Sequence, residues 1–310
     1  MPRYPGLARM GVADECLKRM VAKLGGLRQL ERFEEFVMTW ANAELVPEYG
    51  GDDDVGKIQD DGQKLVARGN YPGLTEHVPV RAGRPAWADA LEKAAPQIEA
   101  ELVEAQAAQA FQGDGFFGGK YGQGYSGIAL ARHCAVVDGA AEAFPKTLAA
   151  LSAVADSERP HDDHDVGLGC TIGATRLAFF AKQKAQTHVE LHSDNVNWLV
   201  TAHLGLQVPD DGEVALFFPH FHKSIRWQKH QLAPLLQTSF EHAAVNDSPK
   251  TNRTILYFDL FHPELSGAER QGLRLFDELR RGLSLPGTPK PPAKALSARE
   301  MFEAQAAAAV

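Results

Sequence analysis

Two histidines, one aspartate and one arginine in the second half of the chain have the types and the order of a metal centre that also binds a carboxylate. His192 and Asp194 are separated by one residue, His242 follows 48 residues after Asp194, and Arg253 comes eleven residues later. Two imidazoles and one carboxylate on one side of an ion leave its other side open, as a non-haem Fe(II) centre needs in order to bind a chelating cosubstrate and dioxygen. A guanidinium can hold a carboxylate through two parallel hydrogen bonds. The pattern therefore predicts that the first three side chains ligate iron and that the arginine holds the far carboxylate of the cosubstrate.

The elements that must position these residues read as short strands. From about Ala174 onward the side chains alternate as in strands, and turn signals rich in Pro, Asp, Asn and Gly separate the runs. The runs cover residues 176–182, 187–192, 197–208, 213–219, 224–229 and 253–261. A jelly roll can place distant residues on neighbouring strands at one mouth, so the separation between Asp194 and His242 is no obstacle. We predict a mainly β fold with helical additions, in which a double-stranded β-helix (jelly roll or cupin-like) core packs against N-terminal helices.

Helical periodicity marks the first half of the chain. Four apolar residues between Leu30 and Trp40 recur at helical spacing, which predicts helices in the first fifty residues. A further helical stretch runs roughly from Pro85 to Ala110, where Pro96 should kink or delimit the helix.

Composition limits the broad class. Of 310 residues 44% are hydrophobic and 23% charged, and no apolar run is long enough to cross a bilayer, so we expect a globular protein with no membrane partner. The N-terminus lacks the apolar segment of a secretory signal, which favours a cytoplasmic location. A formal net charge of −8 argues against nucleic acid as the main partner. Cys16, Cys134 and Cys170 are far apart, and we expect packed or free thiols.

Five short sequence motifs surround the predicted ligands. They are W-A-D-A-L-E at 87–92, F-P-K-T at 144–147, H-L-G-L at 203–206, S-F-E-H at 239–242 and H-P-E-L at 262–265. His192 precedes His203, the first residue of H-L-G-L, by eleven residues, and His242 closes S-F-E-H. These motifs and this interval resemble the aspartyl/asparaginyl β-hydroxylase family of Fe(II)/2-oxoglutarate-dependent oxygenases. The resemblance runs from about residue 85 to residue 270.

The resemblance implies an Fe(II)-carrying double-stranded β-helix in which Arg253 pairs with the distal carboxylate of 2-oxoglutarate and His203 lies near its other end. Without the family, His203 would be interpreted as a core histidine. Animal members of the family have glycine where this chain has Asp194 and bind iron through two histidines only. The aspartate completes a three-ligand site and favours hydroxylation over halogenation. Animal members have a serine that helps to hold the cosubstrate, and this chain has Ala181 at that position. They also have an arginine two residues before the histidine of H-L-G-L, and this chain has Thr201 there, so we expect the cosubstrate contacts to differ.

The family further implies a dioxygenase that uses dioxygen and hydroxylates a small-molecule or peptide substrate, namely an amino acid, a peptide or a related metabolite. Two alternatives stay open: a jelly-roll module that binds a metal without catalysis, and a metal-dependent hydrolase. We divide the chain into a helical N-terminal extension (1–80), an oxygenase domain (81–284) whose β-helix core spans about 170–265, and a Pro-rich linker with a short C-terminal helix (285–310). That last helix is a candidate contact for a homo-oligomer.

Several other residues admit two interpretations. The glycine-rich segment 111–128 is either an ordinary connection or a mobile lid. Trp198, Trp227 and Phe240 either pack in the core, which we favour, or line the substrate pocket. The cluster from His161 to Asp165 has the composition of a metal site, but its residues are consecutive, so we expect a solvated loop.

Overall fold

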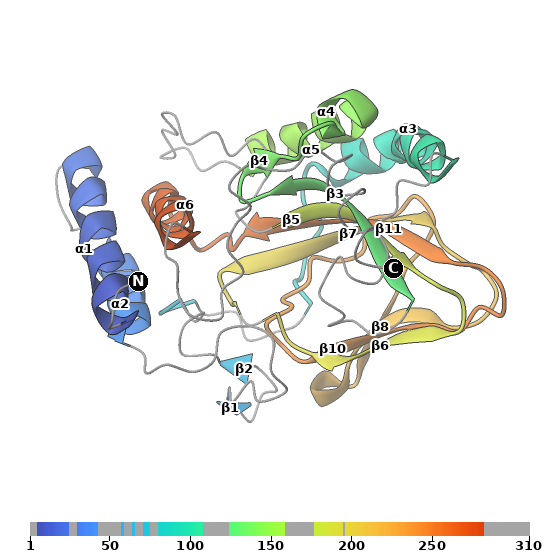
Figure 1. The fold of residues 1–310 in the computed structure, drawn as a ribbon. Helices are drawn as coiled ribbons and strands as arrows, with labels where there is room; N and C mark the ends of the chain where they lie inside the picture. Colours follow the sequence, from blue (N-terminus) through green and yellow to red (C-terminus); the bar gives the residue numbers. More distant parts are fainter. Residues whose placement is uncertain are drawn as a thin grey trace, which may run out of the picture.

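Two antiparallel β-sheets face each other at the centre of the molecule (Figure 1). In this computed structural model the described residues are 5–24, 30–42, 57–58, 64–65, 71–74, 80–107, 124–158, 177–194 and 196–281. The larger sheet has the strand order β4-β3-β5-β11-β7 and the smaller one the order β6-β10-β8-β9, while β1 and β2 form a separate pair. The strands are β1 (Lys57–Ile58), β2 (Lys64–Leu65), β3 (Tyr125–Arg132), β4 (Ala135–Val136), β5 (Leu177–Gln183), β6 (Thr187–His192), β7 (Leu199–Gln207), β8 (Val214–Phe218), β9 (Lys223–Arg226), β10 (His242–Asn246) and β11 (Arg253–Phe261).

Both faces of the larger sheet are covered. In β5, Phe180 packs against the helices outside the sheet, whereas its neighbour Phe179 packs toward the smaller sheet. Leu256 and Ile255 divide in the same way in β11. Successive strand residues point to opposite faces, so a slip of one residue would exchange the two sets. The hydrophobic pattern thus selects which residues of each strand enter the space between the sheets.

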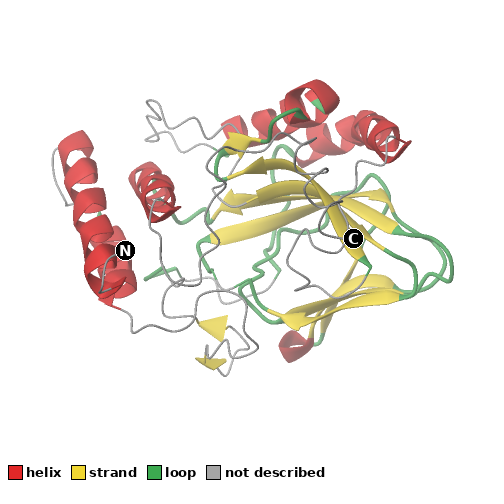
Figure 2. Ribbon diagram, viewed as in Figure 1, coloured by secondary structure: helices red, strands yellow, loops and turns green. Residues whose placement is uncertain are grey.

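Helices flank the sheets on two sides (Figures 1 and 2). The helices α3, α4 and α5 lie along the outer face of the larger sheet, and α1, α2 and α6 lie together at one end of it. Their bounds are α1 (Pro5–Leu24), α2 (Glu31–Asn42), α3 (Ala88–Ala107), α4 (Ala140–Ala143), α5 (Pro145–Ser157) and α6 (Gly267–Arg281), and a 3₁₀ turn covers Pro219–Phe221. Among the described helices, we find none whose length and hydropathy would allow it to span a bilayer.

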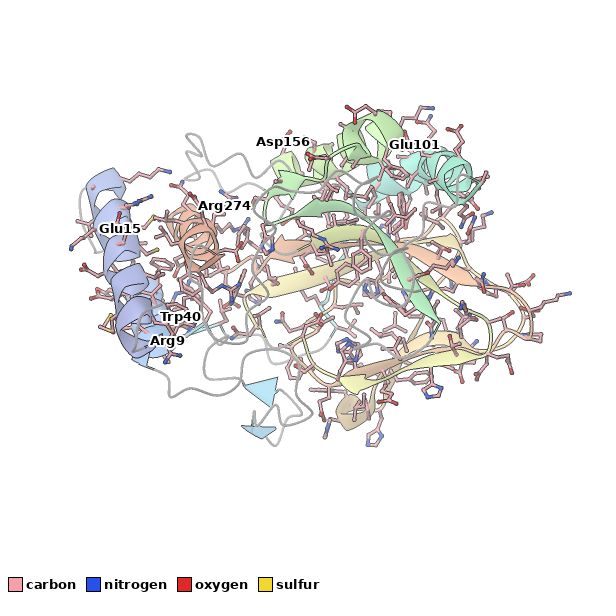
Figure 3. All side chains as sticks on the ribbon, in the orientation of Figure 1. Arg9, Glu15, Trp40, Glu101, Asp156 and Arg274 are labelled. Carbon is pink, nitrogen blue, oxygen red and sulfur yellow. The ribbon has the colours of Figure 1, made fainter. Side chains whose placement is uncertain are left out.

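A carboxylate of α3 caps α5, which explains the F-P-K-T motif. Glu101 is 8% exposed and lies where α3 meets α5 (Figure 3). It accepts hydrogen bonds from the backbone N–H groups of Lys146 and Thr147 at 2.8 and 2.9 Å, and from the Thr147 hydroxyl at 2.6 Å. The first N–H groups of a helix have no partner inside the helix, and Pro145 at its start has no N–H to satisfy. The motif therefore begins a helix that is tied to its neighbour.

The N-terminal helices share a core with α6 and the end of the larger sheet. Trp40 of α2 meets Phe276 of α6 edge to face, with ring centroids 4.8 Å apart. Arg32 forms an ion pair with the buried Glu269, with N and O atoms 2.7 Å apart. Leu199, the first residue of β7, belongs to the same apolar cluster. The predicted packing of N-terminal helices against the β core is therefore observed.

Gly205 of the H-L-G-L motif allows the segment after β9 to lie directly on β7. Its N–H donates to the Gln231 carbonyl at 3.0 Å, and its carbonyl accepts from the His230 N–H at 2.7 Å. A Cβ atom at this position would overlap the carbonyl oxygen of Gln228. Only glycine permits this approach of two backbones. The motif thus sets the path of the chain that follows Trp227.

We expect Gly205→Ala to destabilise the protein by about 1–3 kcal/mol, as overpacking of a rigid contact usually does. Gly11 is the matched control because it lies exposed within α1, and a Cβ there would meet nothing within 4 Å. Gly11→Ala should stabilise by about 0.5–1 kcal/mol, since alanine loses less backbone entropy in a helix. Urea unfolding of both variants measures the difference. Equal and small effects would show that the segment after β9 yields to the added methyl group.

The mainly antiparallel β fold with helices is confirmed. Strands β3 and β10 were not predicted. β3 starts within the glycine-rich segment, and glycine has no side chain to contribute to the alternating pattern from which strands are predicted. Of the two effects expected of Pro96, a kink or the end of its helix, the second is wrong, because α3 continues to Ala107. Cys16 is a buried free thiol as expected, but Cys134 is disulfide-bonded, which contradicts the expectation of free thiols.

Candidate metal and cosubstrate site

His192 and His242 lie opposite each other on paired strands of the smaller sheet. His192 ends β6 and His242 begins β10, and the two are register partners. The pairing shifts between His242 and Ala244, which is a bulge of the kind that re-aims side chains beside functional sites. The imidazole ring centroids are 4.3 Å apart. Asp194 follows β6 and is held by its N–H, which donates to the Thr238 carbonyl at 2.8 Å.

The three side chains can share one ion. One ligand atom from each of His192, Asp194 and His242 lies within 4.8 Å of the others. In both histidines Nδ1 lies 2.8 Å from a backbone carbonyl oxygen two residues earlier, that of Glu190 or Phe240. A carbonyl only accepts, so Nδ1 carries the proton and Nε2 keeps its lone pair for a metal. The donor set of two imidazole nitrogens and one carboxylate suits ferrous iron with open positions.

Arg253 is a buried cation that lies in the same cavity. It is 1% exposed, and burial lowers the pKa of its guanidinium to about 10, which leaves it charged at neutral pH. Its Nη2 donates to the Gln183 side-chain oxygen at 2.7 Å, and its Cζ lies 4.3 Å from the centre of the Trp227 ring. Its Nε has no hydrogen-bond partner among the described residues. A buried guanidinium with an open N–H is suited to an anionic ligand.

Tyr125 stands beside Arg253 and was not singled out from the sequence. Burial raises the pKa of its hydroxyl to about 12, so the phenol stays neutral, and it is hydrogen-bonded to the arginine. Gln183, which faces Arg253 in the register of β5 and β11, was also missed. The alternation within 176–182 could have suggested Gln183, since it continues that strand by one residue. Tyr125 gave no such signal because it lies among glycines.

His203 is buried at 5% exposure, and two of its features define what its ring can do. Its Nδ1 accepts a hydrogen bond from the Trp227 Nε1–H at 3.3 Å, while its Nε2 has no partner among the described residues. Burial, and next the charge of Arg253, lower the pKa of this imidazole to about 3. The ring is therefore neutral at physiological pH.

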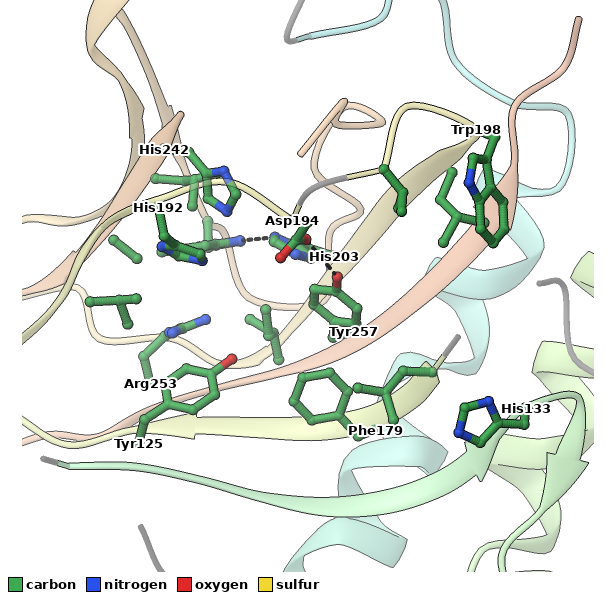
Figure 4. Close-up of a pocket in the computed structure, with 18 of the residues that line it drawn as sticks. Tyr125, His133, Phe179, His192, Asp194, Trp198, His203, His242, Arg253 and Tyr257 are labelled. Carbon is green, nitrogen blue, oxygen red and sulfur yellow. Dashed lines mark hydrogen bonds between the residues drawn. The ribbon is translucent and has the colours of Figure 1, made fainter. Parts of the chain in front are cut away.

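With the exception of Gln183, these residues line one cavity of about 450 Å³ between the sheets. Figure 4 shows Tyr125 and Arg253 on one side of the three candidate ligands, and Trp198 and His133 on the other. Phe179 and other apolar side chains form most of the wall between these ends. The apolar lining residues are Leu177, Phe179, Val189, Val196, Trp198, Leu199, Leu216, Trp227, Ala244 and Ile255. The cavity thus has a charged pole at Arg253, a cluster of candidate ligands in the middle and a largely apolar remainder, which also includes the polar group of His133, Asp277 and Arg280.

Ala181 and Thr201 stand where other members of the family have a serine and an arginine, and both are part of the buried structure here. Ala181 is fully buried between β3 and β11. The Thr201 hydroxyl is 3.0 Å from that of Thr238 and donates to Asp259 at 3.2 Å. As expected for Trp198 and Trp227, both are buried, and both also line the cavity. Phe240 is fully buried and packs in the core.

Four sequence predictions lie outside the described residues. They concern the cluster 161–165, the glycine-rich segment up to residue 123, the thiol of Cys170 and the C-terminal segment 285–310.

Comparisons with known proteins place the chain in a family. The model of the aspartyl/asparaginyl β-hydroxylase family matches residues 92–263, more than half of the 310 residues. A search of curated proteins finds no match. Among solved structures, the chain is similar to a prolyl-4-hydroxylase of Pseudomonas putida (18% identity, TM-score 0.38, 55% of this chain and 87% of that one). It is also similar to a 2OG-Fe(II) oxygenase family oxidoreductase of Burkholderia pseudomallei (13% identity, TM-score 0.36, 60% and 95%).

The match of the family model includes β3 to β11 and therefore every residue of the candidate site. The helices α1, α2 and α6 lie outside it. The chain belongs to the aspartyl/asparaginyl β-hydroxylase family and is an enzyme of that family.

Proposed function

We propose that this enzyme is an Fe(II)/2-oxoglutarate-dependent dioxygenase that hydroxylates a C–H bond of an amino acid, a peptide or a related small metabolite. One observation carries the proposal: two imidazole Nε2 atoms and a carboxylate converge in a cavity that also holds a buried guanidinium. His192, Asp194 and His242 hold the iron, and the backbone carbonyls of Glu190 and Phe240 keep the two imidazoles in the ligating tautomer. Bound there, Fe(II) with 2-oxoglutarate and dioxygen supplies the oxidation of the C–H bond, with succinate and CO₂ as coproducts.

The cosubstrate is held at both ends by residues of the larger sheet. Arg253, with Tyr125 and Gln183 around it, binds the distal carboxylate, because two charge-assisted hydrogen bonds suit a guanidinium and a carboxylate. His203 donates from Nε2 toward the other end. A neutral imidazole that donates is compatible with the nearby iron, because it adds no positive charge.

The two facing sheets form a double-stranded β-helix in this proposal. Residues 81–284 make up the oxygenase domain, with 1–80 as an N-terminal extension and 285–310 as a linker and helix. The sheets exclude water from the reacting centre, and the strand ends supply the ligands.

The substrate occupies the part of the cavity that Phe179, Trp198 and Leu199 line. These walls orient a small apolar group by contact and exclude water from it. Because Asp194 fills the third protein position on the metal, hydroxylation is favoured over halogenation.

The test is cosubstrate turnover. The purified protein with Fe(II), ascorbate and 2-oxoglutarate should form succinate above background, and addition of cell extract should reveal a metabolite that gains one oxygen atom. Succinate at background with every extract would instead support a metal-binding module without catalysis. Metal-dependent hydrolysis that is indifferent to 2-oxoglutarate would support the hydrolase.

Removal of the Tyr257 hydroxyl should weaken metal binding slightly. This hydroxyl donates to Asp194 at 3.4 Å, a long hydrogen bond to a proposed ligand. We expect Tyr257→Phe to lower Fe(II) affinity by at most about tenfold, the lower end of what loss of a ligand's hydrogen-bond partner costs. Tyr71→Phe is the control because the Tyr71 hydroxyl donates to Glu269 of α6, which is not a candidate metal ligand. Titration of both variants with Fe(II) measures the effect. Equal Fe(II) affinities of Tyr257→Phe and Tyr71→Phe would show that the Tyr257 hydroxyl does not support Asp194 as a ligand.

A further inference from the structure

Trp227 contacts both residues that hold 2-oxoglutarate in the proposed function. It follows β9, is 5% exposed, and lines the cavity. Its indole N–H donates to His203 Nδ1 at 3.3 Å, and the guanidinium carbon of Arg253 lies 4.3 Å from its ring centre. The two contacts use different parts of the side chain, the edge for the histidine and the face for the arginine. One residue thus links the two ends of the cosubstrate site.

The indole contact determines which nitrogen of His203 bears the proton. An indole nitrogen can only donate, so the Nδ1 that faces it must be unprotonated. The buried imidazole is neutral, and a neutral imidazole with a bare Nδ1 carries its proton on Nε2. This Nε2–H has no acceptor among the described residues, although buried donors are nearly always paired. The Nε2–H of His203 can therefore donate a hydrogen bond to a ligand that carries an acceptor atom.

The ring face constrains Arg253 in a comparable way. A guanidinium over an indole face is held with its plane restricted, so its N–H groups keep their directions. Gln183 accepts from Nη2, while Nε has no acceptor among the described residues. Two donors with fixed directions therefore border the same cavity, and both depend on Trp227. A dianion with an acceptor at each end satisfies both of them.

Backbone contacts explain how Trp227 is kept in place. Arg226, the residue before it, pairs with Ala215 of β8. Gln228, the residue after it, lies against Gly205, two residues beyond His203. The H-L-G-L motif therefore supplies both the histidine and the space that allows the tryptophan to reach it.

We propose that Trp227 is a positioning residue for the cosubstrate: its N–H selects the Nε2–H tautomer of His203, and its ring face orients Arg253. The proposal rests on the proposed function for the identity of the ligand, but the tautomer can be tested without any ligand. Without this N–H, the imidazole could place its proton on Nδ1 and present a lone pair to a carboxylate, which would repel it.

The first experiment is ¹⁵N NMR of the metal-free protein with labelled histidine, with the His203 signals assigned by their absence in His203→Gln. The wild type should show a protonated Nε2 and an unprotonated Nδ1 from pH 5 to pH 8. Trp227→Phe, which keeps an aromatic face and removes the N–H, should show loss of that single tautomer. Trp87→Phe is the matched control, because Trp87 is also a buried tryptophan with a donating N–H, but this N–H binds Glu158 and the residue is not among those that line the cavity. A wild-type spectrum with the proton on Nδ1 would overturn the proposal even if the variant failed to fold.

The second experiment is anaerobic calorimetry of 2-oxoglutarate binding to the Fe(II) protein. Trp227→Phe should weaken binding by tenfold or more, and Trp87→Phe should not. The Trp227→Phe effect should also be smaller in a His203→Leu background, because part of it acts through the histidine. Unchanged affinity with unchanged His203 signals would refute the role of Trp227 and leave the proposed function intact. If the wild type bound no 2-oxoglutarate, the proposed function would fail, while the tautomer result would still stand for an anion-binding site.

Discussion

Asp194→Ala is expected to remove most of the iron affinity and nearly all coupled hydroxylation. Loss of a partner that only supports a ligand already costs about 10–100-fold in metal affinity, so loss of the ligand itself should exceed about 100-fold. The backbone around Asp194 should persist, since its N–H bonds to the Thr238 carbonyl and does not depend on the side chain. Metal titration and succinate formation measure the two effects separately.

Asp210 offers the control for this change, because it is an exposed carboxylate in the turn after β7. Asp210→Ala should retain wild-type metal binding and turnover. If Asp194→Ala retained near-full activity, the two histidines would suffice, as in the family members that have glycine at this position. In that case the aspartate would serve the site only through its contact with Tyr257.

Arg253→Leu is expected to raise the dissociation constant of 2-oxoglutarate while iron binding is kept. Truncation of one partner of a buried charge pair costs about 2–5 kcal/mol, which corresponds to about 30-fold to 5000-fold weaker binding. Leucine fills part of the apolar space against Trp227, and removal of a buried cation relieves its desolvation, so the fold should survive. Anaerobic calorimetry with the Fe(II) protein gives the affinity directly.

Two further arginine variants test the reason for this effect. Arg253→Lys keeps the charge but loses the planar fork, so its affinity should fall between those of the wild type and Arg253→Leu. Arg226→Leu removes an exposed guanidinium of β9, whose ion pair with Glu213 is 3.1 Å long and solvent-accessible. This variant should bind 2-oxoglutarate normally. Wild-type affinity in Arg253→Leu would mean that the distal carboxylate is bound elsewhere in the cavity.

Much of the site could be anticipated because each candidate ligand lies in a short motif whose residue types and spacing are visible in the sequence. Residues i and i+2 at a strand end share a face, so His192 and Asp194 were expected to lie together. The interval from His192 to His203 and the S-F-E-H motif identified the remaining histidines. The convergence of the three candidate ligands is observed in the structure, whereas their binding of iron stays a prediction.

The sequence by itself determined most strands after residue 176, although not β10, together with the residue types of the candidate ligands and the family, since each depends on short-range spacing. Only the tertiary structure decided which residues surround Arg253, and it added Tyr125 and Gln183 from strands far away in the chain. It also decided the role of Trp227, which from the sequence was expected to be a core residue. Hydrogen-bond direction depends on register, bulges and the approach of backbones from different strands. No local pattern encodes the angle at which an indole N–H meets an imidazole, so the proton on His203 could be assigned only once β7, β9 and β11 were in place.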